Sequence, residues 1–270
     1  MDDLKQPRTL GRTGMTAGRL GIAGGYGAPA AAVELAFERG CNYFYHGSFR
    51  KSGMTTAIKN IVKRGQREKL IVVDQLYTRN LWHFRKSFES FFRQTGLDYA
   101  DVLLLGWYDK PPSPRILDLA RELREQGKFK YLAVSGHNRK LFPELARDPA
   151  FGLFHVRYNA VHRGAETEIF PKLPEPRPGI ATYTATRWRH LLDPKKTPPG
   201  SPTPRASDCY RFALSNPNVD VCICGPKSME QMEEALATLE RGPLSPEELE
   251  WMTRVGDHIH HNYKGPIGSR

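Results

Sequence analysis

Residues 97–135 read LDYADVLLLGWYDKPPSPRILDLARELREQGKFKYLAVS, and this stretch decides the fold class. Its first apolar run, Val102–Trp107, predicts a buried β-strand. Apolar residues at helical spacing follow over 113–126, and Gly127 comes after them like a helix C-cap. A second apolar run, Tyr131–Ser135, predicts another strand. Strands that are almost entirely apolar are typical of parallel sheets covered on both faces, so the stretch indicates a strand–helix–strand unit.

The same unit repeats along the chain. The expected strands are Leu20–Ala23, Tyr43–His46, Leu70–Gln75, Val102–Trp107, Tyr131–Ser135, Leu153–Tyr158, Gly179–Thr184 and Val219–Cys224. The expected helices are 29–39, 53–65, 80–95, 113–126, 138–147, 164–173, 205–215 and 228–240. This alternation predicts an α/β fold, a (β/α)8 TIM barrel, with residues 1–270 as a single domain. An open doubly wound sheet is the weaker alternative, because Gly21–Gly27 lacks the G-x-G-x-x-G spacing.

Composition excludes several other classes of protein. Hydrophobic residues at 39% and aromatic residues at 10% can supply a core, which argues against wholesale disorder. There is no run of 18 apolar residues, and the N-terminus lacks the apolar stretch of a secretory signal, so we expect a cytoplasmic protein without a membrane span. With 40 Lys and Arg against 29 Asp and Glu, the formal charge of +11 indicates an anionic partner without identifying it.

The cysteines and the histidine cluster favour structural roles over metal binding. No C-x-x-C pair is present, so we expect the cysteines to be small buried side chains in a reducing compartment. A solvated helix end is the simpler interpretation of the three histidines near the C-terminus, and we predict no metal site. These residues are Cys41, Cys209, Cys222, Cys224, His258, His260 and His261.

In a barrel of this kind, chemistry takes place where the strands end at their carboxyl side. Tyrosine, histidine and arginine side chains are concentrated at these predicted strand ends. The candidates are Tyr45, His46, Arg50, Gln75, Tyr77, Gly106, Trp107, Ser135, His137, Asn138, His155, Arg157, Asn159, Tyr183, Arg187, Gly225, Lys227 and Ser228. The alternative for any one of them is a polar side chain that is merely solvated at the barrel rim.

Several motifs, in their order and spacing, make the chain similar to the aldo-keto reductase superfamily over nearly its whole length. The matching stretches are Leu10–Met15 with Leu20–Gly24, Gly40–Phe44, Leu97–Leu105, Gln126–Ser135 and Asn216–Val219 with Gly225–Gln231. The resemblance implies an N-terminal β-hairpin before the barrel and an extra C-terminal helix after it. It also implies NADP(H) as cofactor and a small-molecule substrate, and it does not indicate an oligomeric state.

The resemblance fails at the catalytic positions of the family, which reduces carbonyls with an Asp, a Tyr, a Lys and a His. The matching positions here carry Tyr45, Arg50, Gln75 and Gly106. The family Lys lowers the pKa of the proton-donating Tyr, and neither Gln75 nor Gly106 can replace the Lys and His. Loss of general acid catalysis typically lowers a rate about 10²–10⁴-fold, so the ordinary family reaction should be impaired.

This chain matches the family more closely at the positions that contact the cofactor than at the catalytic positions. Ser135 matches a contact to the nicotinamide amide, and Tyr183 matches a ring that stacks on the nicotinamide. Gly225, Lys227 and Ser228 match the site of the adenosine 2′-phosphate, and Gln231 is a further cofactor-binding candidate. A cation and a hydroxyl at a helix N-terminus also suit a phosphate on physical grounds, although an ordinary helix cap would look the same.

The basic, proline-rich segment Arg187–Arg205 is expected to be a long loop. In the family this region folds over the cofactor pyrophosphate, and Arg187 is therefore a cofactor candidate. The alternatives are a disordered surface loop or a nucleic-acid patch, and the latter is disfavoured because no nucleic-acid-binding motif accompanies it.

Three hypotheses for function follow. In the first, the protein is an NADPH-dependent enzyme with a remodelled site, in which Arg50 or Arg157 polarises the substrate. Proton transfer would come from Tyr45, with its pKa lowered by Arg50, or from His155. Gln75 and Tyr77 complete the catalytic set, and His46, Trp107, His137 and Arg157 contact substrate. The second hypothesis is a cofactor-binding protein without catalysis, and the third is a lyase or isomerase that uses no nicotinamide.

Overall fold

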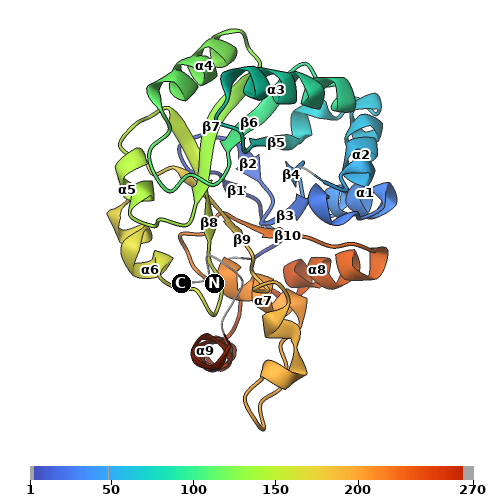
Figure 1. Cartoon of the computed structure of the whole chain (residues 1–270). Helices are drawn as coiled ribbons and strands as arrows, with labels where there is room; N and C mark the ends of the chain where they lie inside the picture. Colours follow the sequence, from blue (N-terminus) through green and yellow to red (C-terminus); the bar gives the residue numbers. More distant parts are fainter. Residues whose placement is uncertain (1–2, 48, 264–270) are drawn as a thin grey trace.

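Eight parallel strands close into a barrel in this computed structural model, which describes residues 3–47 and 49–263 (Figure 1). Around the barrel they are β3 (Leu20–Ala23), β4 (Tyr43–Tyr45), β5 (Ile71–Leu76), β6 (Ala100–Leu105), β7 (Phe129–Gly136), β8 (Phe151–Arg157), β9 (Gly179–Tyr183) and β10 (Val221–Cys224). Strand β10 pairs with β3 and closes the ring. The TIM-barrel prediction is confirmed, and the open doubly wound sheet is excluded.

The strands are apolar on both faces because both faces are buried. On β6, Val102 and Leu104 point into the barrel interior. Their neighbours Leu103 and Leu105 belong to the larger cluster packed between the strands and the helices. Successive side chains of a strand point to opposite faces, and here each face meets an apolar layer.

Helices surround the barrel, and most agree with the ranges expected from sequence. They are α1 (Ala30–Glu38), α2 (Ser52–Lys63), α3 (Leu81–Thr95), α4 (Pro114–Glu125), α5 (Leu141–Leu145), α6 (Ala165–Glu168), α7 (Ala206–Leu214) and α8 (Met229–Arg241). Two are shorter than expected. The region 138–147 forms only α5, and 164–173 forms α6 followed by the 3₁₀ helix η3 (Phe170–Lys172). Pro171 has no N–H to continue an α-helix there.

The two ends of the barrel differ. The predicted hairpin, β1 (Arg8–Thr9) with β2 (Thr16–Ala17), is present, and Leu10 and Ala17 join the interior apolar cluster. The hairpin thus closes the amino ends of the strands and leaves the carboxyl ends as the place for a site. The expected extra helix is α9 (Pro246–Asn262), which lies outside the ring of helices near α7 (Figure 1).

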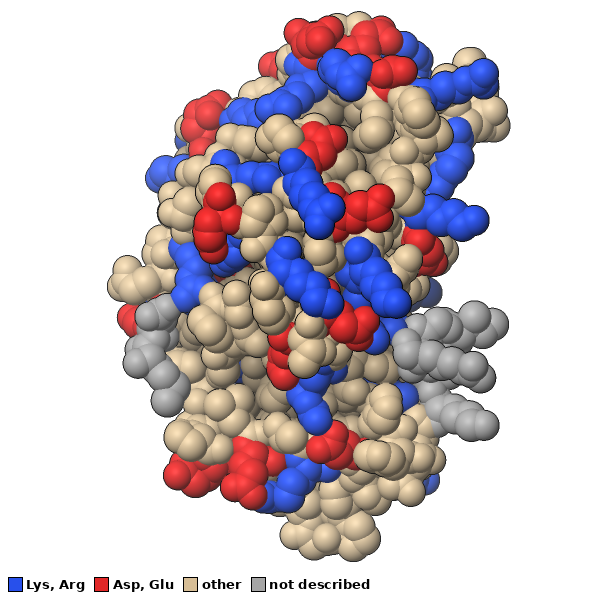
Figure 2. Space-filling view, turned by 90° about the vertical axis from the view of Figure 1, so that its left-hand side faces the viewer, with Lys and Arg blue, Asp and Glu red and all other residues tan. Residues whose placement is uncertain are grey.

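The segment 187–205 is more ordered than the expected loop. It contains two 3₁₀ helices, η4 (His190–Leu192) and η5 (Pro194–Lys196), and it extends beside α9 (Figure 1). Basic and acidic side chains are interspersed on the face of the molecule shown in Figure 2, so the positive charge does not gather into one patch there. Within the described residues, every helix is too short or too polar to cross a membrane.

Candidate active site

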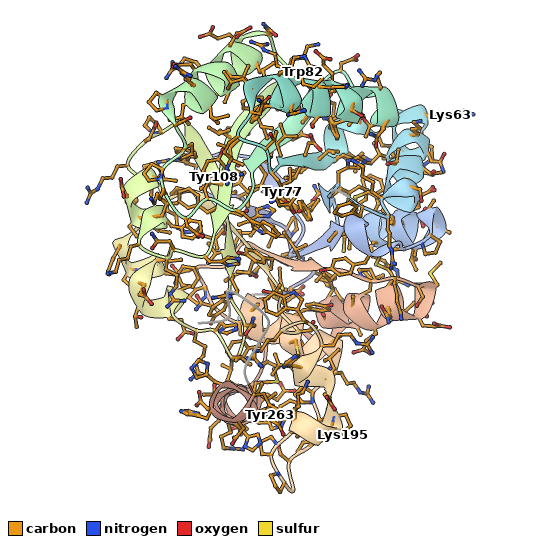
Figure 3. The ribbon with its side chains drawn as sticks, viewed as in Figure 1. Lys63, Tyr77, Trp82, Tyr108, Lys195 and Tyr263 are labelled. Atoms are coloured by element: carbon orange, nitrogen blue, oxygen red, sulfur yellow. The ribbon has the colours of Figure 1, made fainter. Side chains whose placement is uncertain are left out.

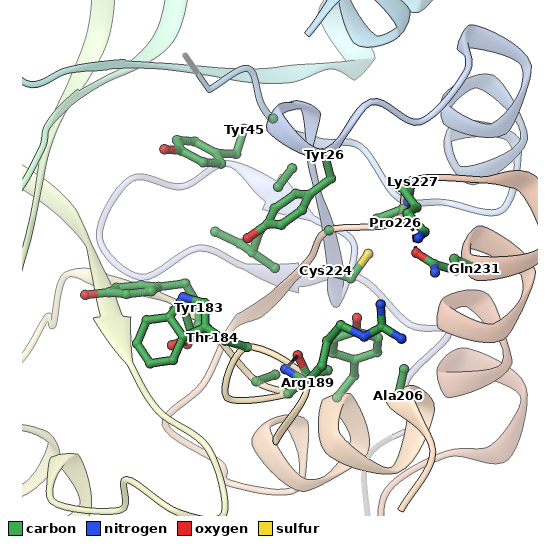
Figure 4. Close-up of a pocket in the computed structure, with 18 of the residues that line it drawn as sticks. Tyr26, Tyr45, Tyr183, Thr184, Arg189, Ala206, Cys224, Pro226, Lys227 and Gln231 are labelled. Carbon is green, nitrogen blue, oxygen red and sulfur yellow. Dashed lines mark hydrogen bonds between the residues drawn. The ribbon is translucent and has the colours of Figure 1, made fainter. Parts of the chain in front are cut away.

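A large cavity opens at the carboxyl ends of the barrel strands, with a volume of about 1040 Å³. This volume is at the upper end of the range for small-molecule and cofactor sites, about 300–1,000 Å³. Most of the residues predicted from sequence line it, namely Tyr45, Arg50, Gln75, Tyr77, Trp107, Ser135, His137, His155, Tyr183, Gly225, Lys227 and Gln231 (Figure 4).

His46, predicted to contact substrate, does not reach the cavity. It follows Tyr45, which points inward, and therefore points outward between the barrel and its helices. Its side chain is 0% exposed, its Nε2 lies 2.9 Å from the Thr55 hydroxyl on α2, and its ring packs against Phe91 on α3. The substrate-binding prediction for His46 is thus wrong because one position along a strand reverses the direction of the side chain.

Three further predicted residues lie outside the cavity wall. Arg157 is buried at the end of β8, next to Tyr183 and His137, and these two line the cavity in its place. Arg187 turns away from the cavity and donates a hydrogen bond to the carbonyl of Tyr263. The Ser228 hydroxyl accepts a hydrogen bond from the Gln231 backbone N–H, so it serves as the N-cap of α8.

Two tyrosines meet inside the cavity. The hydroxyl oxygens of Tyr45 and Tyr77 are 3.3 Å apart, and Tyr77 also packs edge-on against the Trp107 ring. Burial, and after it the neighbouring Tyr77, holds the pKa of Tyr45 well above its usual value. The expectation that Arg50 lowers this pKa is therefore wrong, and the Tyr45 hydroxyl stays protonated and neutral.

The absence of a side chain at Gly106 is what allows this arrangement. A Cβ at this position would lie 2.4 Å from the Gln75 amide nitrogen and 2.8 Å from the Tyr77 ring. Tyr77 and Gln75 thus occupy the space into which a side chain on this strand end would project. Tyr77, which follows β5, thus fills the space beside the backbone of Gly106, which follows β6.

His155 lies deeper in the barrel than the tyrosine pair. Its Nε2 is 2.7 Å from the buried Tyr43 hydroxyl, and its ring packs edge-on against Tyr45. Burial lowers the pKa of His155 to about 3. The ring is therefore neutral near pH 7 and carries no imidazolium proton that it could give to a substrate. This differs from the hypothesis that His155 is the proton donor.

Gln75 and Ser135 form a small polar group on the cavity wall. The Ser135 hydroxyl oxygen accepts hydrogen bonds from the Gln75 amide and the Trp107 backbone N–H, both at 3.3 Å. The Gln75 carbonyl oxygen is buried and has no partner among the described residues. A buried acceptor without a donor is costly, so this atom points to a ligand that carries an N–H or O–H group.

Unpaired cations line the outer part of the cavity. Arg50, Arg189 and Lys227 make no side-chain hydrogen bond or ion pair within the described part of the chain. The carboxylate of Glu234, which also lines the cavity, accepts hydrogen bonds from the Ser207 hydroxyl and backbone. The cavity therefore has an excess of positive charge that suits an anionic ligand.

Sequence reasoning missed several residues of the wall. They are Tyr26, Phe49, Thr184, Trp188, Arg189, Arg205, Tyr210 and Glu234. One of them explains Gly225, because a Cβ there would lie 2.3 Å from the Tyr26 ring. No motif in the sequence marks these residues, since most lie in loops whose direction is set by packing.

Backbone conformation marks the same region independently. Among the described residues other than glycine, those with positive φ are Arg50, Trp107, Thr184, Arg187, Trp188 and Arg189. All but Arg187 line the cavity. A positive φ is unfavourable for bulky side chains, and such strain tends to cluster at ligand sites.

Comparison with known proteins agrees with the fold. The profile of the aldo/keto reductase family matches residues 28–197, and the chain belongs to this family. The structure is similar to the holo form of the aldo-keto reductase AKR11C1 from Bacillus halodurans, with a TM-score of 0.75, 17% identity, and coverage of 93% of this chain and 96% of that chain.

The apo form of the same Bacillus halodurans protein gives a TM-score of 0.74 with 17% identity, over 93% of this chain and 95% of that chain. At this identity the likeness concerns the fold. Among curated proteins, no sequence matches significantly.

Proposed function

We propose that this protein is an NADP(H)-binding oxidoreductase that acts on a small carbonyl or anionic substrate through a site altered from the family pattern. Membership of the aldo/keto reductase family supports the reaction class. The single observation that carries the proposal is the cavity itself, whose wall holds both unpaired cations and two tyrosine hydroxyls 3.3 Å apart.

The residues of the cavity fit a nicotinamide dinucleotide. The unpartnered Gln75 carbonyl oxygen and the Ser135 hydroxyl suit the donor and acceptor atoms of a carboxamide. The Tyr183 ring would stack on the nicotinamide, and Lys227 before α8 suits a phosphate. When bound, NADPH supplies a hydride to an electrophilic carbon.

The tyrosine pair would act on the substrate by hydrogen bonding. Because the pKa of Tyr45 is raised by burial, its hydroxyl remains a donor across the physiological range. Neutral donors held in place by the fold stabilise negative charge that develops on a carbonyl oxygen. Arg50 at the rim would bind an anionic group of the substrate. The protein thus provides charge stabilisation without the acidic tyrosine of the family mechanism, and water entering the open cavity would supply the proton to the reduced oxygen.

Thermal unfolding with NADPH, with NADH and without ligand tests the cofactor. A ligand at about 100 times its Kd adds about 2.7 kcal/mol to the free energy of unfolding. For a chain of this size that corresponds to a rise in Tm of about 5–10 °C. If neither dinucleotide raises Tm, the proposal is wrong. NADPH consumption over a panel of carbonyl compounds then tests catalysis, and Y45F with Y77F should lower any rate observed.

A second candidate, a cofactor-binding protein without catalysis, is favoured by one observation. Neither Tyr45 nor His155 has a pKa suited to proton transfer near pH 7. In that case NADPH binds but is not consumed. Introducing the family residues as Y45D, R50Y, Q75K and G106H, with Y77A to free the space beside position 106, should then create activity, whereas under the first proposal it would replace an activity already present.

A further inference from the structure

The segments that follow β5 and β6 carry two aromatic rings of the cavity wall. Tyr77 follows β5 and Trp107 follows β6, and their ring centroids are 5.0 Å apart. The pairing of the two strands ends where the Gly106 N–H donates a hydrogen bond of 2.9 Å to the carbonyl of Leu76. The direction of both rings therefore depends on contacts made beyond the end of the sheet.

Arg79 joins these two segments with one side chain. Its Nη1 atom donates hydrogen bonds to the carbonyls of Tyr77 and Gly106, and its Nη2 atom donates one to the carbonyl of Trp107. Its guanidinium also lies over the buried Tyr108 ring, 3.7 Å from the centroid. Tyr77 and Tyr108 lie near each other in Figure 3, and Arg79 contacts both segments. Hydrogen bonds from a charged donor are about twice as strong as those between neutral groups, so this contact can order the loop ends.

The backbone of Trp107 needs such support. Its φ is 57°, and a left-handed conformation is unfavourable for a bulky residue unless the surrounding structure holds it. On the side of β7, the Tyr108 N–H donates a hydrogen bond of 2.7 Å to the carbonyl of Ser135. On the side of β5, the carbonyl of Trp107 accepts a hydrogen bond from Arg79. The guanidinium thus holds the segment from the side on which Tyr77 lies.

The same contacts fix the place of the Tyr77 ring. The ring lies against Gly106, where an added Cβ would be 2.8 Å from it, and its hydroxyl is 3.3 Å from that of Tyr45. The Tyr77 residue is 37% exposed, so packing encloses only part of it. A side chain that ties the backbone of Tyr77 to that of Gly106 therefore helps to set the distance between the two hydroxyls.

We infer that Arg79 is a positioning residue for the tyrosine pair: it holds Tyr77 beside Gly106, with its hydroxyl next to that of Tyr45. This inference rests on the proposed function, in which the two hydroxyls stabilise charge on the substrate oxygen. Arg79 does not line the cavity formed by the described residues, so it acts through the ring that it positions. A misplacement of about 1 Å can lower a rate about 100-fold, and the effect of Arg79 should therefore appear in catalysis.

Fluorine NMR of the full chain, with 3-fluorotyrosine placed only at position 77, tests the positioning directly. The ring packs against Trp107, so its resonance should differ from that of free fluorotyrosine, and W107F should remove much of this difference. R79A should move the resonance toward the free value. R79K keeps the charge but lacks the planar fork, and it should do the same. Both variants should fold, because Arg79 is exposed.

R85A is the matched control for this measurement. Arg85 is an arginine on α3 whose guanidinium donates a hydrogen bond to the carboxylate of Glu122 on α4, away from the cavity wall. The resonance should not change in R85A. A resonance that also stays unchanged in R79A and R79K overturns the inference.

Steady-state kinetics with the carbonyl compound that is reduced fastest tests the consequence for catalysis. R79A should lower kcat about 10- to 100-fold, with the Kd of NADPH changed less than about twofold. R79A with Y77F should be no slower than Y77F alone, because Arg79 acts through the Tyr77 hydroxyl. Added ethylguanidinium should restore part of the rate of R79A, whereas ethylammonium, which lacks the planar fork, should not.

The outcomes separate the inference from the proposed function. An active wild type with an equally fast R79A, or additive losses in R79A with Y77F, overturns the inference and leaves the proposed function in place. A wild type that consumes NADPH with no carbonyl compound overturns the proposed function. In that case the fluorine resonance of R79A still decides whether Arg79 places the Tyr77 ring.

Discussion

The buried imidazole of His155 should make the protein sensitive to acid. Burial lowers its pKa to about 3, against about 6.5 in the unfolded chain. Well above pH 6.5 the ring is neutral in both states, so it contributes no pH dependence there. Below pH 6.5 His155 is protonated in the unfolded chain but not in the folded protein. The free energy of unfolding therefore falls with decreasing pH until the pKa of His155 in the folded protein is reached.

The magnitude follows from these two values. At pH 5 the unfolded ring is almost fully protonated and the folded ring is not. The resulting loss is about 2 kcal/mol relative to pH 8, with a limiting slope of about 1.4 kcal/mol per pH unit. Carboxylates titrate in the same range, so the contribution of His155 has to be isolated by a variant. H155Q removes the titration and keeps a hydrogen-bonding group near Tyr43.

Urea unfolding of the wild type and H155Q between pH 4.5 and pH 8 measures this contribution. The free energy of unfolding of H155Q should fall less steeply with acid, with the difference between the two proteins shrinking by about 2 kcal/mol from pH 8 to pH 5. H83Q, which removes an exposed histidine, controls for the loss of an imidazole. Parallel curves for the wild type and H155Q would refute the reasoning.

Three further predictions concern other parts of the molecule. G106A should lower the free energy of unfolding, measured with urea, by about 1–3 kcal/mol because the new Cβ meets Gln75 and Tyr77. Adding Y77A to G106A should recover part of this loss. S245A removes the side-chain cap of α9 and should cost about 0.5–2 kcal/mol, measured the same way; an unchanged midpoint would show that the cap is not needed. NADPH affinity should fall more steeply with added salt than NADH affinity, because salt screens the attraction between the unpaired cations of the cavity wall and the extra phosphate. Equal salt dependence of the two affinities, in titrations at several salt concentrations, would contradict the placement of this phosphate beside those cations.

The barrel could be predicted because its signal is local and repeated. An apolar run such as Val102–Leu105 indicates a strand covered on both faces, whatever the rest of the chain does. Helix limits were accurate where the helix is long, as in α3, and inaccurate where it is a short turn, as in α5 and α6. Short elements depend on tertiary contacts, which no local pattern records.

The site could be predicted in part. Placing chemistry at the carboxyl ends of strands found residues such as Tyr45, Gln75 and Tyr77, which do line the cavity. His46 was also predicted to contact substrate, but it is one residue after Tyr45, and its side chain therefore points to the opposite face of the strand, away from the cavity. The same reasoning also missed Arg189, whose direction depends on a left-handed turn that the residue type does not favour.

The order of residues was enough to predict a closed parallel barrel and the edge at which the candidate site lies, because alternation and apolar runs follow from chain geometry. The hairpin was implied only by the family resemblance. Tertiary structure alone decided which groups share the cavity and in what state. Burial raises the pKa of Tyr45 where the sequence suggested that Arg50 would lower it. The contact between Arg187 and α9 joins positions about 75 residues apart. Both depend on distances in the folded protein, and neither depends on neighbours along the chain.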